Sequence, residues 1–214
     1  MKKAVVFLSG ILLSSAVAFA QPSVEAQIGF DNSKFRMKTE NRDAQFTDAK
    51  MGIQAGINVK FGGDQGFYVK PGLHYHNLKT KSDLFNIGIF TSDLTFDMHY
   101  LQLPVALGYS YGISNGDYGY ISADFAPYIG YAVAGKTIGR VNNSETKTDI
   151  DWGTGNNETN PFDAGLKFGL GYKTPFNIFV NAGYTLGLAN MNNGDNLKTN
   201  HRNWNFAIGY SFAL

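Results

Sequence analysis

Large apolar residues occupy every second position in the last part of the chain. They alternate with small or polar residues and stand at Trp204, Phe206, Ile208, Tyr210, Phe212 and Leu214. A period of two places these side chains on one face of a β-strand. The other face carries mainly Ala, Gly and Ser, which suit a crowded lumen better than a surface in water. The pattern predicts a strand of a membrane barrel, with the bulky face toward lipid.

The same alternation recurs earlier in the chain, so we expect eight strands in all. The other seven cover residues 24–34, 50–61, 67–77, 99–111, 120–136, 162–172 and 178–188. In the second of these, Met51, Ile53 and Ile57 are expected to face outward and Gln54 and Asn58 inward. Most of these segments are close to the length of about 9–11 residues that a membrane-spanning strand needs.

Two of these segments contain irregularities. Pro71 interrupts the third segment, and because proline cannot donate a ladder hydrogen bond we expect a bulge there. Before the fourth segment, Leu94, Phe96 and Met98 alternate in the opposite parity. A bulge within residues 98–100 would turn these three side chains outward with the rest.

The connections between segments alternate between short and long. Short, glycine-containing turns are expected at 62–66, 112–118 and 173–177, and long polar loops at 32–49, 78–93, 137–161 and 190–202. Short periplasmic turns opposite long extracellular loops are typical of outer-membrane barrels. The predicted fold class is therefore all-β, an eight-stranded antiparallel up-and-down transmembrane β-barrel. A soluble, lipocalin-like barrel is the alternative, but it would leave the glycine-rich face in water, where glycine weakens a strand.

The N-terminus has the features of a secretory signal peptide. Lys2 and Lys3 precede an apolar run over residues 4–17, and Ala18 and Ala20 form an Ala-x-Ala site. We expect a signal peptide at 1–20, cleavage between Ala20 and Gln21, and a barrel domain at 21–214. A membrane anchor is the alternative, but the run is shorter than the ~20 residues of a spanning helix.

Composition narrows the possible partners and chemistry. The length of 214 residues suits one domain or at most two, and the formal charge is +1, or −1 once the two lysines of the signal peptide are removed. This small net charge gives no indication that nucleic acid is a partner. The chain has no cysteine, which excludes disulfides, thiolate chemistry and lipid attachment to cysteine.

Candidate catalytic or metal-binding residues are few. His74 and His76 share one predicted strand face and could bind a metal ion with a third ligand such as Asp97 or His99. The preferred interpretation is that they are polar fillers of the lumen. A hydrolase at the barrel rim could use residues from the set His74, His76, His99, His201, Asp93 and Asp97, but no motif fixes their geometry. We therefore predict no enzymatic activity, no cofactor and no metal.

Charged residues on the inward face are more informative. They are Lys60, Lys70, Asp124, Asp163 and Lys167, accompanied by Glu25 and Asp31. Buried charges must pair, and an eight-stranded barrel is just wide enough to be filled by side chains. These residues are predicted to form a lumenal polar network that blocks the barrel. The alternative is a polar path for small solutes.

The chain resembles the PorT-like family of small bacterial outer-membrane barrels. The resemblance is carried by residues 100–105, 130–136, 163–171, 184–190 and 208–212. It implies an eight-stranded barrel in the outer membrane of a Gram-negative cell, without a catalytic set. The name-giving member is associated with protein secretion machinery, a role that barrel motifs alone do not transfer.

Together these features predict a non-enzymatic outer-membrane barrel with a structural or surface-interaction role. Both termini are expected in the periplasm and the long loops outside the cell. The expected partners are membrane lipid, the barrel assembly machinery and an unidentified extracellular or secretion-machinery protein, and the barrel itself is expected to be a monomer. Two alternatives stay open, a narrow porin-like channel and a rim-located hydrolase or lipid-modifying enzyme.

Overall fold

The computed structural model describes residues 22–39, 42–44, 48–87, 90–141, 144–155, 158–193 and 197–214. The expected signal peptide at 1–20 and its cleavage site at Ala20 and Gln21 lie outside these residues. Within the described ranges, no helix is both long enough and apolar enough to cross a membrane.

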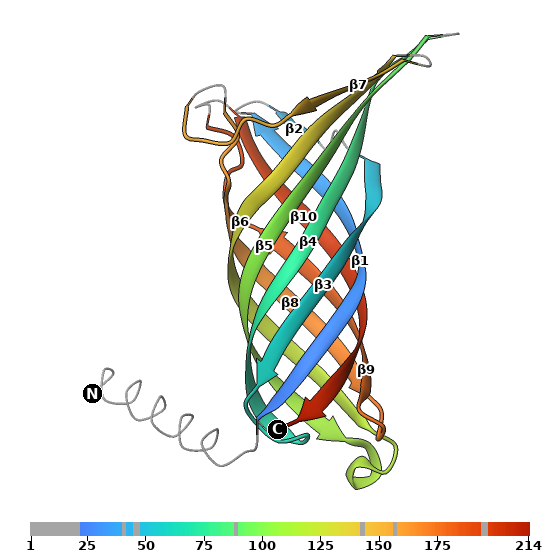
Figure 1. The fold of residues 1–214 in the computed structure, drawn as a ribbon, viewed down its shortest axis with the longest axis vertical. Coiled ribbons are helices and arrows are strands. Elements are labelled where there is room, and N and C mark those ends of the chain that lie inside the picture. Colours follow the sequence, from blue (N-terminus) through green and yellow to red (C-terminus); the bar gives the residue numbers. More distant parts are fainter. Residues whose placement is uncertain are drawn as a thin grey trace, which may run out of the picture.

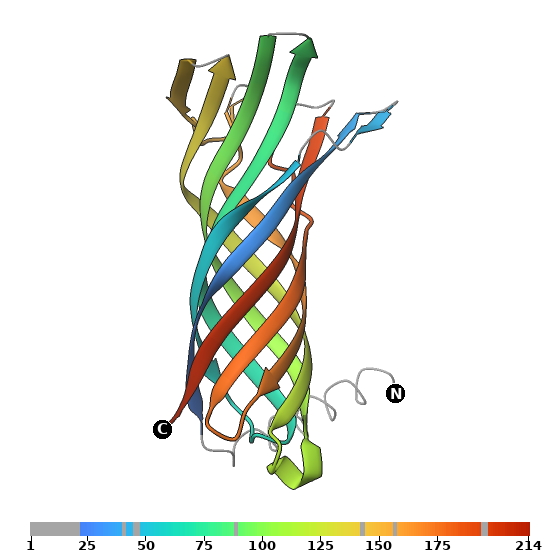
Figure 2. The same cartoon turned by 90° about the vertical axis from the view of Figure 1, so that its right-hand side faces the viewer.

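Eight long strands form a closed antiparallel barrel (Figures 1 and 2). They are β1 (Ser23–Thr39), β3 (Asp48–Lys60), β4 (Gly66–Ile87), β5 (Phe90–Gly112), β6 (Tyr120–Val141), β8 (Phe162–Lys173), β9 (Ile178–Gly187) and β10 (Leu197–Ala213). Each barrel strand pairs with the next one along the chain. Two short strands, β2 (Arg42–Ala44) and β7 (Ser144–Asp149), extend β1 and β6 as hairpins. The predicted fold class is confirmed.

The first and last strands close the ring. β1 and β10 pair without interruption from Ser23 opposite Ala213 to Thr39 opposite Leu197. At one end of this seam the backbone N–H of Leu214 donates to the carbonyl of Pro22 at 3.2 Å. Closure pairs the backbone groups that an open sheet would leave at its edge, which removes the need for another chain to cover them.

Side chains alternate between the outer wall and the lumen as the sequence predicts. On β3, Met51, Ile53 and Ile57 are 71%, 63% and 58% exposed, whereas Gln54 and Asn58 are buried. On β10 the exposed outer row is Trp204, Phe206, Ile208, Tyr210 and Phe212. The apolar row thus forms the outside of the barrel, and the small and polar row encloses its interior.

The barrel has two unlike ends. The terminal end carries Pro22, Leu214 and the three short turns, at which Gly62, Asn115 and Asn177 adopt positive φ. The loop end lies at the top of Figure 1, where β4, β5, β6 and β7 extend beyond the rest of the wall. The predicted short turns are confirmed, including the Asn-Gly turn, which lies in a 3₁₀ segment over Ile113–Gly116.

The long connections contain more strand than the sequence suggests. Much of 78–93, expected as a loop, continues β4 and β5 as a hairpin, and the other three long loops also lose residues to strands. The outer face of this hairpin is polar, with Lys79 Nζ 3.4 Å from Asp97 Oδ2 and Lys81 Nζ 3.1 Å from Asp93 Oδ2. Hydrophobic alternation ends where the apolar wall ends, whereas backbone pairing continues past it.

The expected bulge at Pro71 is wrong. Asn58 pairs with Gly72 and Phe61 with Val69, so three residues separate the two pairs on both strands. On the other side Pro71 pairs with Val105 in an unshifted ladder. The register therefore passes through the proline unchanged.

The bulge expected near residue 99 is present, but on the neighbouring strand. His99 pairs with Ala134 and Tyr100 with Ala132, which leaves Val133 of β6 without a partner residue on β5. β5 keeps its parity, so Met98 stays buried inside the barrel and does not turn outward. The expected outward direction of Leu94, Phe96 and Met98 is wrong, because the interior near the loop end is apolar and accepts them.

Candidate functional site

The lumen near the terminal end is crossed by an ion-pair cluster centred on Lys70. Its Nζ lies 3.4 Å from Glu25 Oε2 and 3.6 Å from Asp124 Oδ2. The hydroxyl of Tyr68 donates to Asp124 Oδ2 at 2.9 Å. These groups come from β4, β1 and β6, so the cluster bridges strands that are not neighbours in the wall.

Lys60 lies in the same region, where its ammonium group faces an aromatic ring. Its Nζ lies 4.8 Å from the centre of the Tyr68 ring, and Lys70 Nζ lies 5.4 Å from the same centre. An aromatic face attracts cations, so the Tyr68 ring interacts with both ammonium groups. Of the predicted network, Lys60, Lys70 and Asp124 are therefore close together in the terminal half of the lumen.

A second cluster lies higher in the lumen around His76. Its Nδ1 is 2.8 Å from Asp31 Oδ2, and Lys167 Nζ is 2.9 Å from its Nε2. Asp31 also accepts a hydrogen bond from the amide of Asn203 at 2.7 Å, and Ser33 donates to Asn203. The chain of contacts runs from β10 through β1 and β4 to β8 and spans the lumen.

Asp163 forms the centre of a third group. Its Oδ2 lies 3.0 Å from His201 Nε2 and accepts from Gln102 Nε2 at 3.1 Å, and the hydroxyl of Tyr128 is 3.0 Å from the same imidazole nitrogen. Among the described side chains, Gln102 Oε1, Asp163 Oδ1 and His201 Nδ1 are buried without a hydrogen-bond partner. Unpaired buried polar atoms cost stability. This group is therefore the least compensated part of the lumen.

A small cavity lies among these clusters. A cavity of about 70 Å³ is bordered by Lys70, Asp124, His74 and Lys167, together with several amide side chains. Such a volume holds a few water molecules and no larger solute. The five predicted network residues thus line one filled lumen, but they fall into separate groups and do not form a single network.

The four histidines have different partners; His201 and His99 each lie near an aspartate, at 3.0 Å from Asp163 and 3.5 Å from Asp97. His74 Nε2 is 2.7 Å from Asn58 Oδ1, whereas His76 is occupied by Asp31 and Lys167. His99 lies on the outer wall, with its Nδ1 2.5 Å from the Tyr75 hydroxyl. No group of three or more His, Cys, Asp or Glu side chains suited to a metal ion occurs within the residues that the structure describes.

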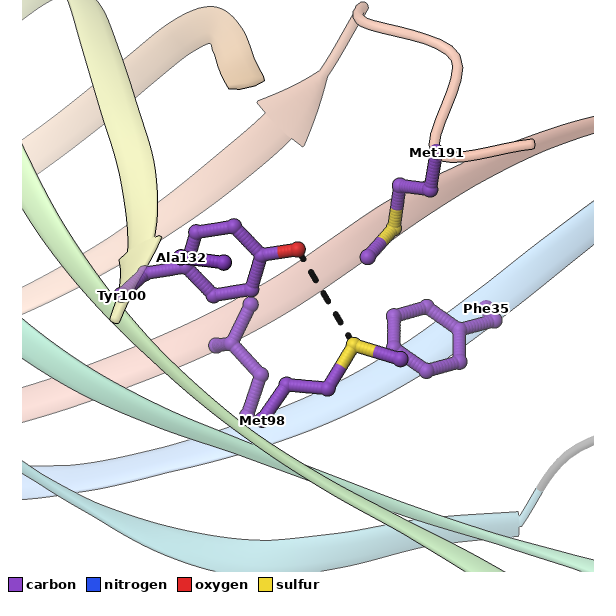
Figure 3. Packing of buried hydrophobic residues seen from close by; sticks show 6 residues of the cluster. Phe35, Met98, Tyr100, Ala132 and Met191 are labelled. Atoms are coloured by element: carbon purple, nitrogen blue, oxygen red, sulfur yellow. Dashed lines mark hydrogen bonds between the residues drawn. The ribbon is translucent and has the colours of Figure 1, made fainter. Parts of the chain in front are cut away.

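Above the polar groups, an apolar cluster fills the lumen at the loop end (Figure 3). Its buried members are Phe35, Leu78, Met98, Tyr100, Ala132 and Met191, and Phe96, Ile150 and Trp152 pack against them. The hydroxyl of Tyr100 donates to Met98 Sδ at 3.9 Å, and its ring meets that of Trp152 edge-on at 6.3 Å. The sequence pattern does not predict this cluster, because apolar residues are assigned to the outer wall.

Loop segments hold part of this cluster in place. Thr159 N–H donates to Asp151 O and Asn160 N–H to Met191 O, both within 3.0 Å. The side-chain amide of Asn193 donates to the carbonyls of Gly153, Gly155 and Glu158 at 2.9–3.2 Å. These bonds tie residues 150–155, 158–161 and 188–193 into a lid that carries Trp152 and Met191 over the lumen.

The β6–β7 hairpin beyond the lid is highly charged. Arg140 Nη2 donates to Glu145 Oε2 at 2.6 Å, and Lys147 Nζ lies 2.9 Å from Glu145 Oε1. These two contacts, the hydrogen bond from Arg140 first, lower the pKa of Glu145 to about 2. The hairpin therefore presents fixed ion pairs at the loop end.

Comparison with known proteins places the chain in a family. The model of the family described as "Outer membrane protein beta-barrel domain" matches residues 19–193. No curated protein matches the chain. The narrower PorT-like resemblance stays a prediction.

Among solved structures, the chain is similar to the attachment invasion locus protein Ail of Yersinia pestis, with 14% identity over 90% of this chain and 99% of that one and a TM-score of 0.42. It is also similar to OprG of Pseudomonas aeruginosa, with 15% identity over 91% of this chain and 96% of that one and a TM-score of 0.43. Neisserial surface protein A is similar as well, with 11% identity over 90% of this chain and 97% of that one and a TM-score of 0.39. The family match covers most of the sequence, and the chain belongs to the outer membrane protein beta-barrel domain family.

Proposed function

We propose that this protein is a non-enzymatic outer-membrane barrel with a closed lumen, which serves as a rigid base for a surface at its loop end. Its long loops face the outside of the cell, both termini face the periplasm, and it works as a monomer after insertion by the barrel assembly machinery. An extracellular or secretion-machinery partner would bind the lid and the projecting hairpins.

One observation carries the proposal, the filling of the lumen along its length. Charged and hydrogen-bonded side chains bridge distant strands around Lys70 and His76, and the cluster at Tyr100 lies above them. A hydrated ion would have to break buried ion pairs and then enter an apolar region, and both steps are costly. This supports a structural or binding role over a narrow porin-like channel.

Planar-bilayer recording tests the closed lumen. The purified, refolded barrel should insert without producing ion-conductance steps, whereas a known open porin under the same conditions serves as the positive control. Reproducible conductance steps from the barrel would refute a closed lumen and favour the channel.

Cysteine labelling in intact cells tests the orientation, and the natural absence of cysteine makes single introduced thiols unambiguous. Thr146→Cys lies on exposed β7 and should react with a membrane-impermeant maleimide in intact cells. Asp117→Cys, in an exposed short turn, should react only after the outer membrane is permeabilised. The opposite labelling pattern would reverse the orientation.

A further inference from the structure

A group of cations lies on the outer wall just beyond the last aromatic residues of the seam. Trp204 pairs with Asn32, and the next outward pair toward the loop end is Lys34 opposite Arg202. Trp204 is exposed and its ring lies 4.9 Å from that of Tyr184. Exposed Trp and Tyr concentrate at the headgroup level of a membrane. Lys34 and Arg202 therefore lie at the depth of the lipid phosphates.

Lys34 and Arg202 form a like-charge pair, which a neighbouring anion would stabilise. Directly opposed residues on one face of an antiparallel pair have Cβ atoms about 5 Å apart, and like charges there repel. Arg202 Nη1 donates to the hydroxyl of Tyr184 at 3.3 Å, which is a neutral partner. A phosphate between the two cations would replace repulsion with charge-assisted hydrogen bonds.

These residues border a groove of about 490 Å³ on the outer wall. Lys34, Arg36 and Arg202 line it, and among the described lining residues Asp48 is the carboxylate. The β4–β5 wall differs, because Lys79 and Lys81 there each face an aspartate.

A second, apolar groove lies nearer the middle of the wall. Its lining includes Phe30, Phe206 and Ala182, the next outward residues after Asn32, Trp204 and Tyr184 on their three strands. The small side chain of Ala182 lies between larger neighbours and leaves room along the wall. A ligand with an anionic head and an acyl chain matches both grooves.

We propose that this site binds the phosphate of an anionic membrane lipid, with Lys34 and Arg202 on the phosphate and an acyl chain along Phe30 and Phe206. Arg36 lines the same groove. The site gives the barrel a fixed lipid beside the β1–β10 seam. It requires a barrel in a membrane, but neither a closed lumen nor a particular orientation, since both leaflets contain phosphate.

Native mass spectrometry of the detergent-solubilised barrel, titrated with diphosphorylated lipid A, tests the site. The double variant Lys34→Gln/Arg202→Gln should weaken binding on the order of tenfold, because each basic residue near a membrane surface contributes about one power of ten or less. The matched variant Lys79→Gln/Lys81→Gln removes the same amount of charge. Each of these lysines already faces an aspartate, so lipid binding should change less than threefold. Both variants are on the outer wall, and unaltered heat-modifiable migration on a gel verifies their folding.

Two further measurements use the unaltered protein. Dephosphorylated lipid A should bind at least tenfold more weakly than the diphosphorylated form, and raising NaCl from 50 to 500 mM should weaken binding of the latter. Equal loss in both double variants, no loss in either, or tight binding of dephosphorylated lipid would overturn the phosphate site. These outcomes are separate from the conductance and labelling results that test the proposed function.

Discussion

At the scale of single residues, Lys70 has the most consequential position in the lumen. It lies between Glu25 and Asp124, so one cation compensates two carboxylates. Removing one member of a buried ion-pair group leaves the others without compensation. The stability of the barrel should therefore depend on the balance of the group more than on any one charge.

Lys70→Met tests this dependence. We expect the free energy of unfolding, measured by urea titration of the barrel in lipid vesicles, to fall by about 3–5 kcal/mol, because two carboxylates stay buried without their cation. The matched variant Lys70→Met/Glu25→Gln/Asp124→Asn removes all three charges and should lose less than the single variant. A single variant as stable as the natural protein would contradict the role assigned to Lys70.

The sequence predicts which residues face the lumen, but not which of them meet. Inward parity alone places Lys70, Asp124 and Asp163 in the interior, as the structure shows. Contacts such as Lys167 to His76 join β8 to β4 and depend on how far neighbouring strands are staggered around the ring. Period-two alternation contains no information on that stagger, so the separation into groups could not be predicted.

At the scale of elements, β3 shows the lipid-facing pattern most clearly. Ile57 lies toward the middle of the apolar wall, and Met51 lies on the same face nearer the loop end. A charge on the lipid face is costly at the membrane centre and much less so near its surface.

Ile57→Lys should therefore reduce the free energy of folding into lipid vesicles by ~2–4 kcal/mol, whereas Met51→Lys should change it by no more than ~1 kcal/mol. Equilibrium urea titrations followed by tryptophan fluorescence measure both. Equal effects at the two positions would show that depth in the membrane does not distinguish them.

The lid depends on the absence of a side chain at Gly135. A Cβ there would lie 2.6 Å from Trp152 Cζ2 and 3.0 Å from Ile150 Cδ1, whereas one at Gly139, four residues along β6, would have no neighbour within 4 Å. Gly135→Leu should displace Trp152 into water and shift its emission to longer wavelength, measured in a Trp204→Phe background. Gly139→Leu is the matched control and should leave the emission unchanged. An unshifted spectrum in Gly135→Leu would mean that Trp152 does not pack on β6.

The ends of the strands and the lid could not be predicted from the sequence. The expected loop at 78–93 is largely strand, because beyond the membrane Lys79 and Asp97 make a polar outer face and the alternation disappears. Met98 and Phe96 were expected to face outward, since the pattern treats every apolar row as lipid-facing. Both face the interior because β5 has no bulge at this point and keeps its parity; the extra residue is Val133 on β6, and nothing in the β5 sequence indicates that position.

At the scale of the whole molecule, closure of the sheet combines these features in one barrel. The β1–β10 seam removes the sheet edges, the apolar wall faces lipid, and charged groups are compensated inside. An eight-stranded ring encloses just enough space for side chains. The fold class was predictable because a single alternation, repeated eight times, specifies both faces of such a wall.

Accessibility along β10 tests the facing of the wall most directly. Single cysteines at each position from 204 to 212 can carry a spin label, since the chain has no other cysteine, and each variant is verified by heat-modifiable migration. In lipid vesicles, collision with dissolved oxygen should peak at positions 204, 206, 208, 210 and 212 and fall at 205, 207, 209 and 211. The reverse alternation, or no alternation, would contradict a closed barrel with its bulky residues toward lipid.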